Sequence, residues 1–105
     1  EDIPIGDKTF DVISNKSGTV FWMRNDQLTE LARTLGTPKD KGAGIFLYKK
    51  KGYKVKKGEK LFTMFAESEM KLDNAIKKLK YMEPVVVREK ISQEIIMDII
   101  KEVQK

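Results

Sequence analysis

The chain has 105 residues, of which 21 are basic and 16 acidic, and it contains neither cysteine nor histidine. The absence of cysteine excludes disulfides and thiolate metal sites, and the absence of histidine removes the commonest metal ligand and the usual general base near pH 7. These two absences argue against a self-contained enzyme, so no catalytic, cofactor-binding or metal-binding residue is expected in this chain.

The first predicted elements are two strands within residues 9–23. Residues with β-branched and aromatic side chains flank turn formers at 15–18, so a hairpin is expected there. A helix follows, with Asn25 or Asp26 as its N-cap and Gly36 at its end. The spacing of apolar residues defines its inward face, which consists of Leu28, Leu31, Ala32 and Leu35.

A second pair of strands is predicted on either side of a lysine-rich connection. One strand opens at about Gly44 and the other covers residues 60–65, while Gly52 and Gly58 let the connection turn. A second helix is expected to begin near Ser68. Its apolar residues recur at helical spacing, at Leu72, Ala75, Ile76 and Leu79.

The last predicted elements are a strand within residues 83–91, where Pro84 cannot continue the preceding helix, and a third helix from Ser92. The inward face of this third helix is predicted as Ile95, Ile96, Ile99, Ile100 and Val103. The order β-β-α-β-β-α-β-α with hairpin-like connections predicts an α+β fold with mixed or antiparallel pairing. No linker divides the chain, so residues 1–105 are expected to form a single domain.

The lysine-rich connection admits two interpretations. Seven of the twelve residues from 49 to 60 are lysine, and Tyr48 and Tyr53 stand among them. Lysines neutralise phosphates and aromatic rings stack on bases, which favours a nucleic-acid patch. A solvated connection that keeps a sheet edge soluble accounts for the same composition. Arginine is absent from this stretch, so specific recognition of nucleic acid is not expected. The lysines are Lys49, Lys50, Lys51, Lys54, Lys56, Lys57 and Lys60.

The string KKKGYKVKKGEKLFTMF, residues 49–65, is similar to the hairpin of biotinyl and lipoyl carrier domains, and Lys71 in EMKL stands where such domains carry their modified lysine. Lys71 lies thirteen positions after Gly58, more than the carrier pattern requires. Lys71 also lies at the start of a helical pattern. A solvated lysine on the outer face of a helix is the simpler interpretation, with a carrier domain as the alternative.

Other polar motifs indicate structure rather than chemistry. Glu67, Glu69 and Asp73 lie near a helix start, where carboxylates favour the helix dipole. The segment Asp40–Gly44 lacks the framing of a phosphate loop, and its glycines are expected to allow a positive φ or a close backbone approach. Trp22 is expected in the core or as an interface anchor. Four methionines are expected to fill the core, namely Met64, Met70, Met82 and Met97.

Three strings occur in an order and spacing that are specific: LGTPKDKGAGI at 35–45, KKGYKVKKGEKLFT at 50–63 and FAESE at 65–69. Together they resemble the C-terminal domain of nucleoside phosphorylases of the thymidine phosphorylase family, and within it the archaeal branch that includes AMP phosphorylase. The upstream segment at residues 11–25 is similar to the strand pair of that family. The resemblance covers about residues 9–90.

The resemblance implies a barrel-sandwich hybrid, an antiparallel unit with a biotinyl/lipoyl-like hairpin and flanking helices. It also implies a parent enzyme that cleaves a nucleoside or a nucleoside monophosphate with phosphate, giving a base and a ribose or deoxyribose phosphate. The catalytic residues of the family lie in two preceding domains, where phosphate and nucleoside are bound, and none of them maps onto this chain. A structural role is therefore expected, in which the domain packs against the preceding domains and helps a homo-oligomer to assemble, without a cofactor.

No apolar run approaches the length of a membrane span, and no signal-peptide pattern opens the chain. A cytoplasmic protein without membrane contact is therefore expected. The chain begins at Glu1 rather than at methionine, which suggests a piece excised from a longer protein.

Overall fold

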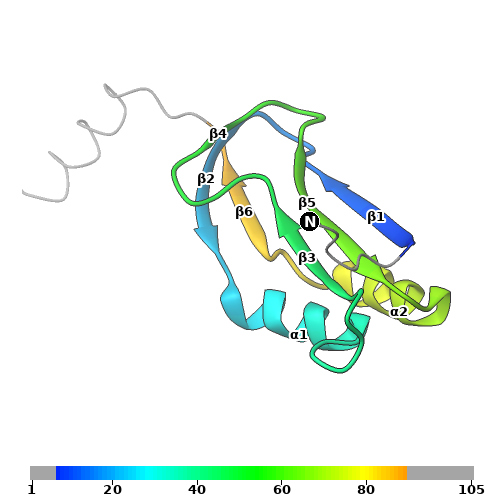
Figure 1. Cartoon of the computed structure of the whole chain (residues 1–105). Coiled ribbons are helices and arrows are strands. Elements are labelled where there is room, and N and C mark those ends of the chain that lie inside the picture. Colours follow the sequence, from blue (N-terminus) through cyan, green and yellow to red (C-terminus); the bar gives the residue numbers. More distant parts are fainter. Residues whose placement is uncertain (1–6, 90–105) are drawn as a thin grey trace, which may run out of the picture.

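The computed structural model describes residues 7–89, which form two three-stranded sheets and two helices (Figure 1). The first sheet has the order β1–β5–β3, with the bounds Lys8–Ile13, Lys60–Ala66 and Gly44–Leu47. The second has the order β4–β2–β6, with the bounds Lys54–Val55, Gly18–Met23 and Val85–Arg88. Every pairing is antiparallel, which confirms the predicted α+β class with antiparallel strands.

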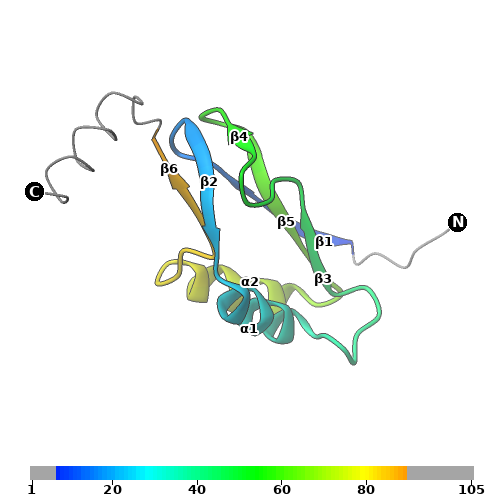
Figure 2. The same cartoon turned by 90° about the vertical axis from the view of Figure 1, so that its left-hand side faces the viewer.

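Both predicted central helices are present, as α1 (Asn25–Leu35) and α2 (Glu69–Leu79), and they pack together across one end of the sheets (Figure 2). Ser68 caps α2, because its hydroxyl accepts the N–H of Lys71 at 3.4 Å. The predicted cap of α1 is wrong. Asn25 and Asp26 already lie inside the helix, and Arg24 occupies the cap position without a side-chain hydrogen bond.

A single core fills the space between the two sheets and the helices. Phe62 and Met64 enter it from the first sheet, and Val20 and Val87 enter it from the second. Both predicted helix faces point inward, with four buried residues, Leu31, Leu35, Leu72 and Ala75. The spacing of apolar residues therefore identified the packing face of each helix.

One predicted hairpin is wrong and the other is confirmed. β1 and β2 flank the turn at 15–18 but belong to different sheets, since β1 pairs with β5 and β2 pairs with β4 and β6. β3 and β5 do pair across the lysine-rich connection. Within that connection the short strand β4 pairs with β2, with Val55 opposite Gly18, so the connection joins the two sheets.

The barrel-sandwich hybrid expected from the resemblance is not confirmed. Within residues 7–89 the two sheets remain separate, so the strands do not close into a barrel. The strand predicted at 83–91 is shorter, as β6, and the third helix predicted from Ser92 lies outside the described residues. Among residues 7–89 no helix has the length and apolar character needed to cross a membrane.

Candidate functional site

The lysine-rich connection lies at the end of the domain opposite the two helices (Figure 2). Gly52 and Gly58 have φ values of +93° and +94°, which confirms that they let this connection turn, since residues with a Cβ rarely adopt such angles. Lys49 is half-buried, and its ammonium group lies 3.7 Å from the carboxylate of Glu59. The other lysines between β3 and β5 are exposed, namely Lys50, Lys51, Lys54, Lys56 and Lys57, and Lys60, the first residue of β5, is exposed as well.

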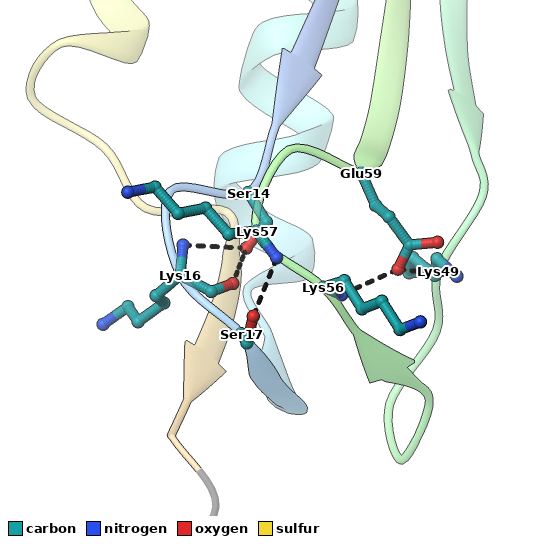
Figure 3. Close-up of polar contacts among 7 residues, drawn as sticks. All are labelled: Ser14, Lys16, Ser17, Lys49, Lys56, Lys57 and Glu59. Carbon is teal, nitrogen blue, oxygen red and sulfur yellow. Dashed lines mark hydrogen bonds and ion pairs between the residues drawn. The ribbon is translucent and has the colours of Figure 1, made fainter.

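Two turns that are far apart in the sequence interlock at this end (Figure 3). The N–H of Ser14 donates to the carbonyl of Glu59, and the N–H of Gly58 donates to the carbonyl of Ser14, both at 2.8 Å. The N–H of Lys57 donates to the hydroxyl of Ser17 at 2.9 Å. Because the hydrogen bonds to Ser14 join backbone groups, they fix the relative position of the two turns independently of the conformations of the lysine side chains.

The hydrogen bonds between the two turns bring Lys16 close to the lysines of the connection. In Figure 3 the side chains of Lys16 and Lys57 extend toward the same side of the paired turns, and Lys56 extends toward the other side. The sequence does not reveal Lys16 as part of this surface, because 41 positions separate it from Lys57 (57 minus 16) and no local pattern joins them. We call this set of lysines the basic end; its members are Lys16, Lys50, Lys51, Lys54, Lys56 and Lys57.

Two exposed aromatic residues lie beside the basic end. Trp22 is 51% exposed and Tyr53 is 50% exposed, and the Lys51 ammonium group lies 4.5 Å from the centre of the Trp22 ring. The prediction that Trp22 is in the core is therefore wrong, which leaves the interface anchor as its interpretation. The ladder between β2 and β6 is irregular between Val20 and Trp22, and both Phe21 and Trp22 are exposed there.

A groove of about 480 Å³ runs along the basic end. Its lining comes from β2 and the turn before it, and from both sides of β4. Glu59 is its acidic lining residue, and the pKa of this carboxyl is lowered because it accepts the N–H of Lys56 at 2.7 Å and lies near Lys49. The groove is lined by Ser17, Gly18, Thr19, Lys49, Lys54, Val55, Lys56 and Glu59.

Lys71 lies in the first turn of α2, as predicted, and not at the tip of a hairpin. Its side chain is 39% exposed, and its ammonium group lies 2.6 Å from the carboxylate of Asp40. It is therefore a paired residue rather than a freely solvated one. The neighbouring Met70 is 69% exposed, so its predicted place in the core is wrong, whereas Met64 is fully buried and Met82 packs against the core.

The segment Asp40–Gly44 connects α1 to β3, and its polar contacts fasten it to the start of α2. Besides the pair of Asp40 with Lys71, the N–H of Gly42 donates to the carboxylate of Glu67 at 2.8 Å. The predicted role of its glycines is wrong for φ, because positive φ occurs at Gly36, before this segment, and not within it; a close backbone approach is also absent at Gly44, where a Cβ would meet no atom within 4 Å. Asp40 and Glu67 thus act as anchors for a loop.

The carboxylates near the start of α2 do not form a metal-binding group. Within residues 7–89, no group of three or more acidic residues is placed to hold a metal ion. The carboxylate of Glu67 accepts the N–H of Gly42, and Glu69 and Asp73 are exposed on α2. That this chain contributes no catalytic residue stays a prediction.

Residues 19–83 match the profile of a family described as the pyrimidine nucleoside phosphorylase C-terminal domain. The chain is 47% identical over 87 residues to AMP phosphorylase 1 of Archaeoglobus fulgidus and 47% identical over 93 residues to AMP phosphorylase of Pyrococcus abyssi. It is 46% identical over 95 residues to AMP phosphorylase of Thermococcus sibiricus. These alignments cover 83%, 89% and 90% of this chain but 17%, 18% and 19% of the relatives, so the chain spans less than a fifth of their length.

Proposed function

Because the chain belongs to the pyrimidine nucleoside phosphorylase C-terminal domain family, we propose that it is the structural C-terminal domain of a phosphorylase of the AMP phosphorylase type. Its parent would cleave a nucleoside monophosphate or a nucleoside with inorganic phosphate, releasing the base and a ribose or deoxyribose phosphate. Phosphate and nucleotide would be bound by the preceding domains, in a homo-oligomer located in the cytoplasm.

Two observations support a structural role. The relatives named AMP phosphorylase are more than five times longer than the aligned segment, which leaves ample chain for catalytic domains elsewhere. The sequence of this chain contains no histidine and no cysteine, the residues most often used as a general base or a thiol nucleophile. The domain is therefore expected to contribute packing rather than chemistry.

The observation that carries the proposal is an aromatic surface on the outer face of the first sheet. Phe46 on β3 is 56% exposed, and Tyr48 after it is 38% exposed, with their rings edge to face at 4.9 Å between centroids. Beneath them the hydroxyl of Thr63 on β5 donates to Asp11 at 2.7 Å and lies 3.0 Å from the Tyr48 hydroxyl. Aromatic residues with a polar tip are typical of interface centres.

We assign this face to contact with the preceding domains of the parent. Phe46 is held by the edge-to-face contact with Tyr48, and Tyr48 by the hydrogen bond with Thr63, so little side-chain entropy is lost when a partner covers them. Lys60 lies 3.3 Å from Asp11 and 5.8 Å from the Tyr48 ring centre, so the charged groups at this face are paired.

The test compares Phe46→Lys with Phe21→Lys in the parent enzyme. Both residues are exposed aromatics, at 56% and 60%, but they lie on different sheets. We expect Phe46→Lys to weaken assembly in light scattering and to reduce phosphate-dependent release of adenine from AMP, and Phe21→Lys to leave both unchanged. Deletion of this domain with no loss of assembly or activity would sink the proposal.

A further inference from the structure

We propose that the basic end binds the phosphate backbone of a single-stranded polynucleotide without sequence preference, with Tyr53 and Trp22 stacking on its bases. This function is separate from the assembly role, because it uses the second sheet and the connection to it rather than the outer face of the first sheet. The observations that support it are the charge, the groove and the two exposed rings.

The charge at this end is concentrated and predominantly positive. The basic end brings together lysines from two connections, and Arg88 lies opposite Thr19 in the ladder between β2 and β6. Near them, the carboxylate of Glu59 is engaged by the N–H of Lys56 and by Lys49, and the exposed Glu89 follows Arg88. Between residues 14 and 23 there is no acidic residue. Such a surface attracts a polyanion and releases its counterions.

The geometry fits an extended strand of phosphates. Lys54 and Lys56 line the groove together with the hydroxyl-bearing Ser17 and Thr19. Lys16 and Lys57 lie next in sequence to the lining residues Ser17 and Lys56, and the hydrogen bonds between the two turns fix their Cα positions before a ligand arrives, although their side chains extend to the side opposite Lys56 (Figure 3). A phosphate backbone can follow the groove past Lys54 and Lys56, while Lys16 and Lys57 add preorganised positive charge on the adjacent side of the paired turns.

The aromatic residues favour a single strand over a duplex. Tyr53 and Trp22 flank the basic end with about half of each side chain exposed, and Lys51 lies over the Trp22 ring. Unpaired bases can stack on such rings, whereas the bases of a duplex are already stacked on one another. Stacking tolerates any base, so binding would be independent of sequence, in keeping with the scarcity of arginine in this region.

The experiment measures fluorescence anisotropy of labelled 12-nucleotide oligo(U), oligo(dT) and a 12-base-pair duplex with the 105-residue chain at 50 and 200 mM salt. We expect both single strands to bind more tightly than the duplex, with affinity falling steeply as salt rises. The ratio of oligo(U) to oligo(dT) affinity tells which polynucleotide is preferred. Absence of binding to either single strand at 50 mM salt would overturn the proposal.

Two variants with the same charge change locate the site. The variant K16A/K56A/K57A leaves the backbone bonds of the interlocked turns intact, and it should lower the slope of log affinity against log salt by about 2, since each phosphate contact on a single strand contributes about 0.7. The control K41A/K77A/K80A removes three exposed lysines near the helices, at the other end of the domain. Equal loss in both variants would show a response to net charge alone and contradict the proposal.

Substitutions of Tyr53 distinguish the contribution of base stacking from the contribution of charge. Tyr53→Ala should weaken binding of the single strands about tenfold, while Tyr53→Phe, which keeps the ring, should retain it. Circular dichroism of each variant establishes that it is folded. If an acidic peptide binds as tightly as oligo(U) and Tyr53→Ala changes neither, the surface recognises a protein rather than a polynucleotide, and the proposal is wrong.

Discussion

The ammonium group of Lys71 lies 2.6 Å from the carboxylate of Asp40, and this pair fastens the loop after α1 to the first turn of α2. The two side chains are 39% and 18% exposed, so the pair is less screened by water than an ion pair on the open surface. Asp40 belongs to the string at 35–45 and Lys71 follows the string at 65–69. The contact therefore gives Asp40, within the string at 35–45, a structural role.

The first prediction concerns the strength of this pair. A double-mutant cycle with Asp40→Asn and Lys71→Met should give a coupling free energy of about 1 kcal/mol in urea unfolding, because both groups are partly withdrawn from solvent. The pair Lys78 and Glu30, at 3.1 Å with side chains 44% and 55% exposed, links α2 to α1 and serves as the control. A coupling no larger than that of the control would show that burial adds nothing to the Asp40 pair.

The second prediction concerns the C-terminus of α1. Gly36 has a φ of +128°, and a Cβ at this position would lie 2.3 Å from the Asp40 carboxylate. We expect Gly36→Ala to lower the free energy of unfolding by more than about 1 kcal/mol, since alanine tolerates neither this φ nor the contact. Gly44→Ala is the control, because a Cβ there meets no atom within 4 Å. Equal stability of the two variants would contradict this account.

The third prediction concerns pH. The carboxylate of Glu59 accepts the N–H of Lys56 and lies near the charge of Lys49. Both effects lower the pKa of Glu59 below its ordinary value of 4.5. The ionised carboxylate therefore stabilises the fold above about pH 4.5, and this contribution is lost as the pH falls through the lowered pKa. The melting temperature should decrease over that acidic range, and less so in Glu59→Gln.

The matched control for the pH experiment is Glu83→Gln. Glu83 is exposed, and within residues 7–89 its carboxylate takes part in no hydrogen bond or ion pair of the structure, although its N–H donates to Gln27. We expect its melting profile to follow that of the unmodified chain between pH 3 and pH 6. A Glu59→Gln profile that also follows the unmodified chain would refute the role given to Glu59.

The fourth prediction concerns the carrier alternative. Co-expression with a biotin or a lipoate ligase should leave the intact mass unchanged, because Lys71 is paired with Asp40 in a helical turn and is not presented on a hairpin tip. The mass spectrum of Lys71→Arg provides the reference. A mass increase in the unmodified chain that disappears in this variant would restore the carrier interpretation.

Much of the local structure was predictable from the sequence. The apolar spacing at Leu31 and Leu35 identified the packing face of α1, and Ser68 marked the start of α2. Gly52 and Gly58 marked the turns of the lysine-rich connection. These features depend on residues within a few positions of one another, so the sequence pattern is sufficient to specify them.

The candidate site was predictable in part. The lysines and tyrosines of residues 48–60 were evident, but Lys16 was not, and Trp22 was expected in the core. Both errors have the same origin. The pairing of the turn at Ser14 with Glu59, and the irregular ladder between β2 and β6, depend on segments far apart in the sequence. The structural propensities of neighbouring residues carry no information about such long-range pairings.

The sequence by itself thus determined α1 and α2, their inward faces, the turn glycines of the lysine-rich connection and the family motifs, because backbone angles and amphipathic spacing are set by neighbouring residues. Tertiary structure alone decided that β1 pairs with β5 rather than with β2 and that Asp40 forms an ion pair with Lys71. It alone also decided that the side chains of Lys16 and Lys57 extend toward the same side of the paired turns. Strand partners and ion pairs are selected by the free energy of burying one shared core, and that quantity depends on all the elements at once.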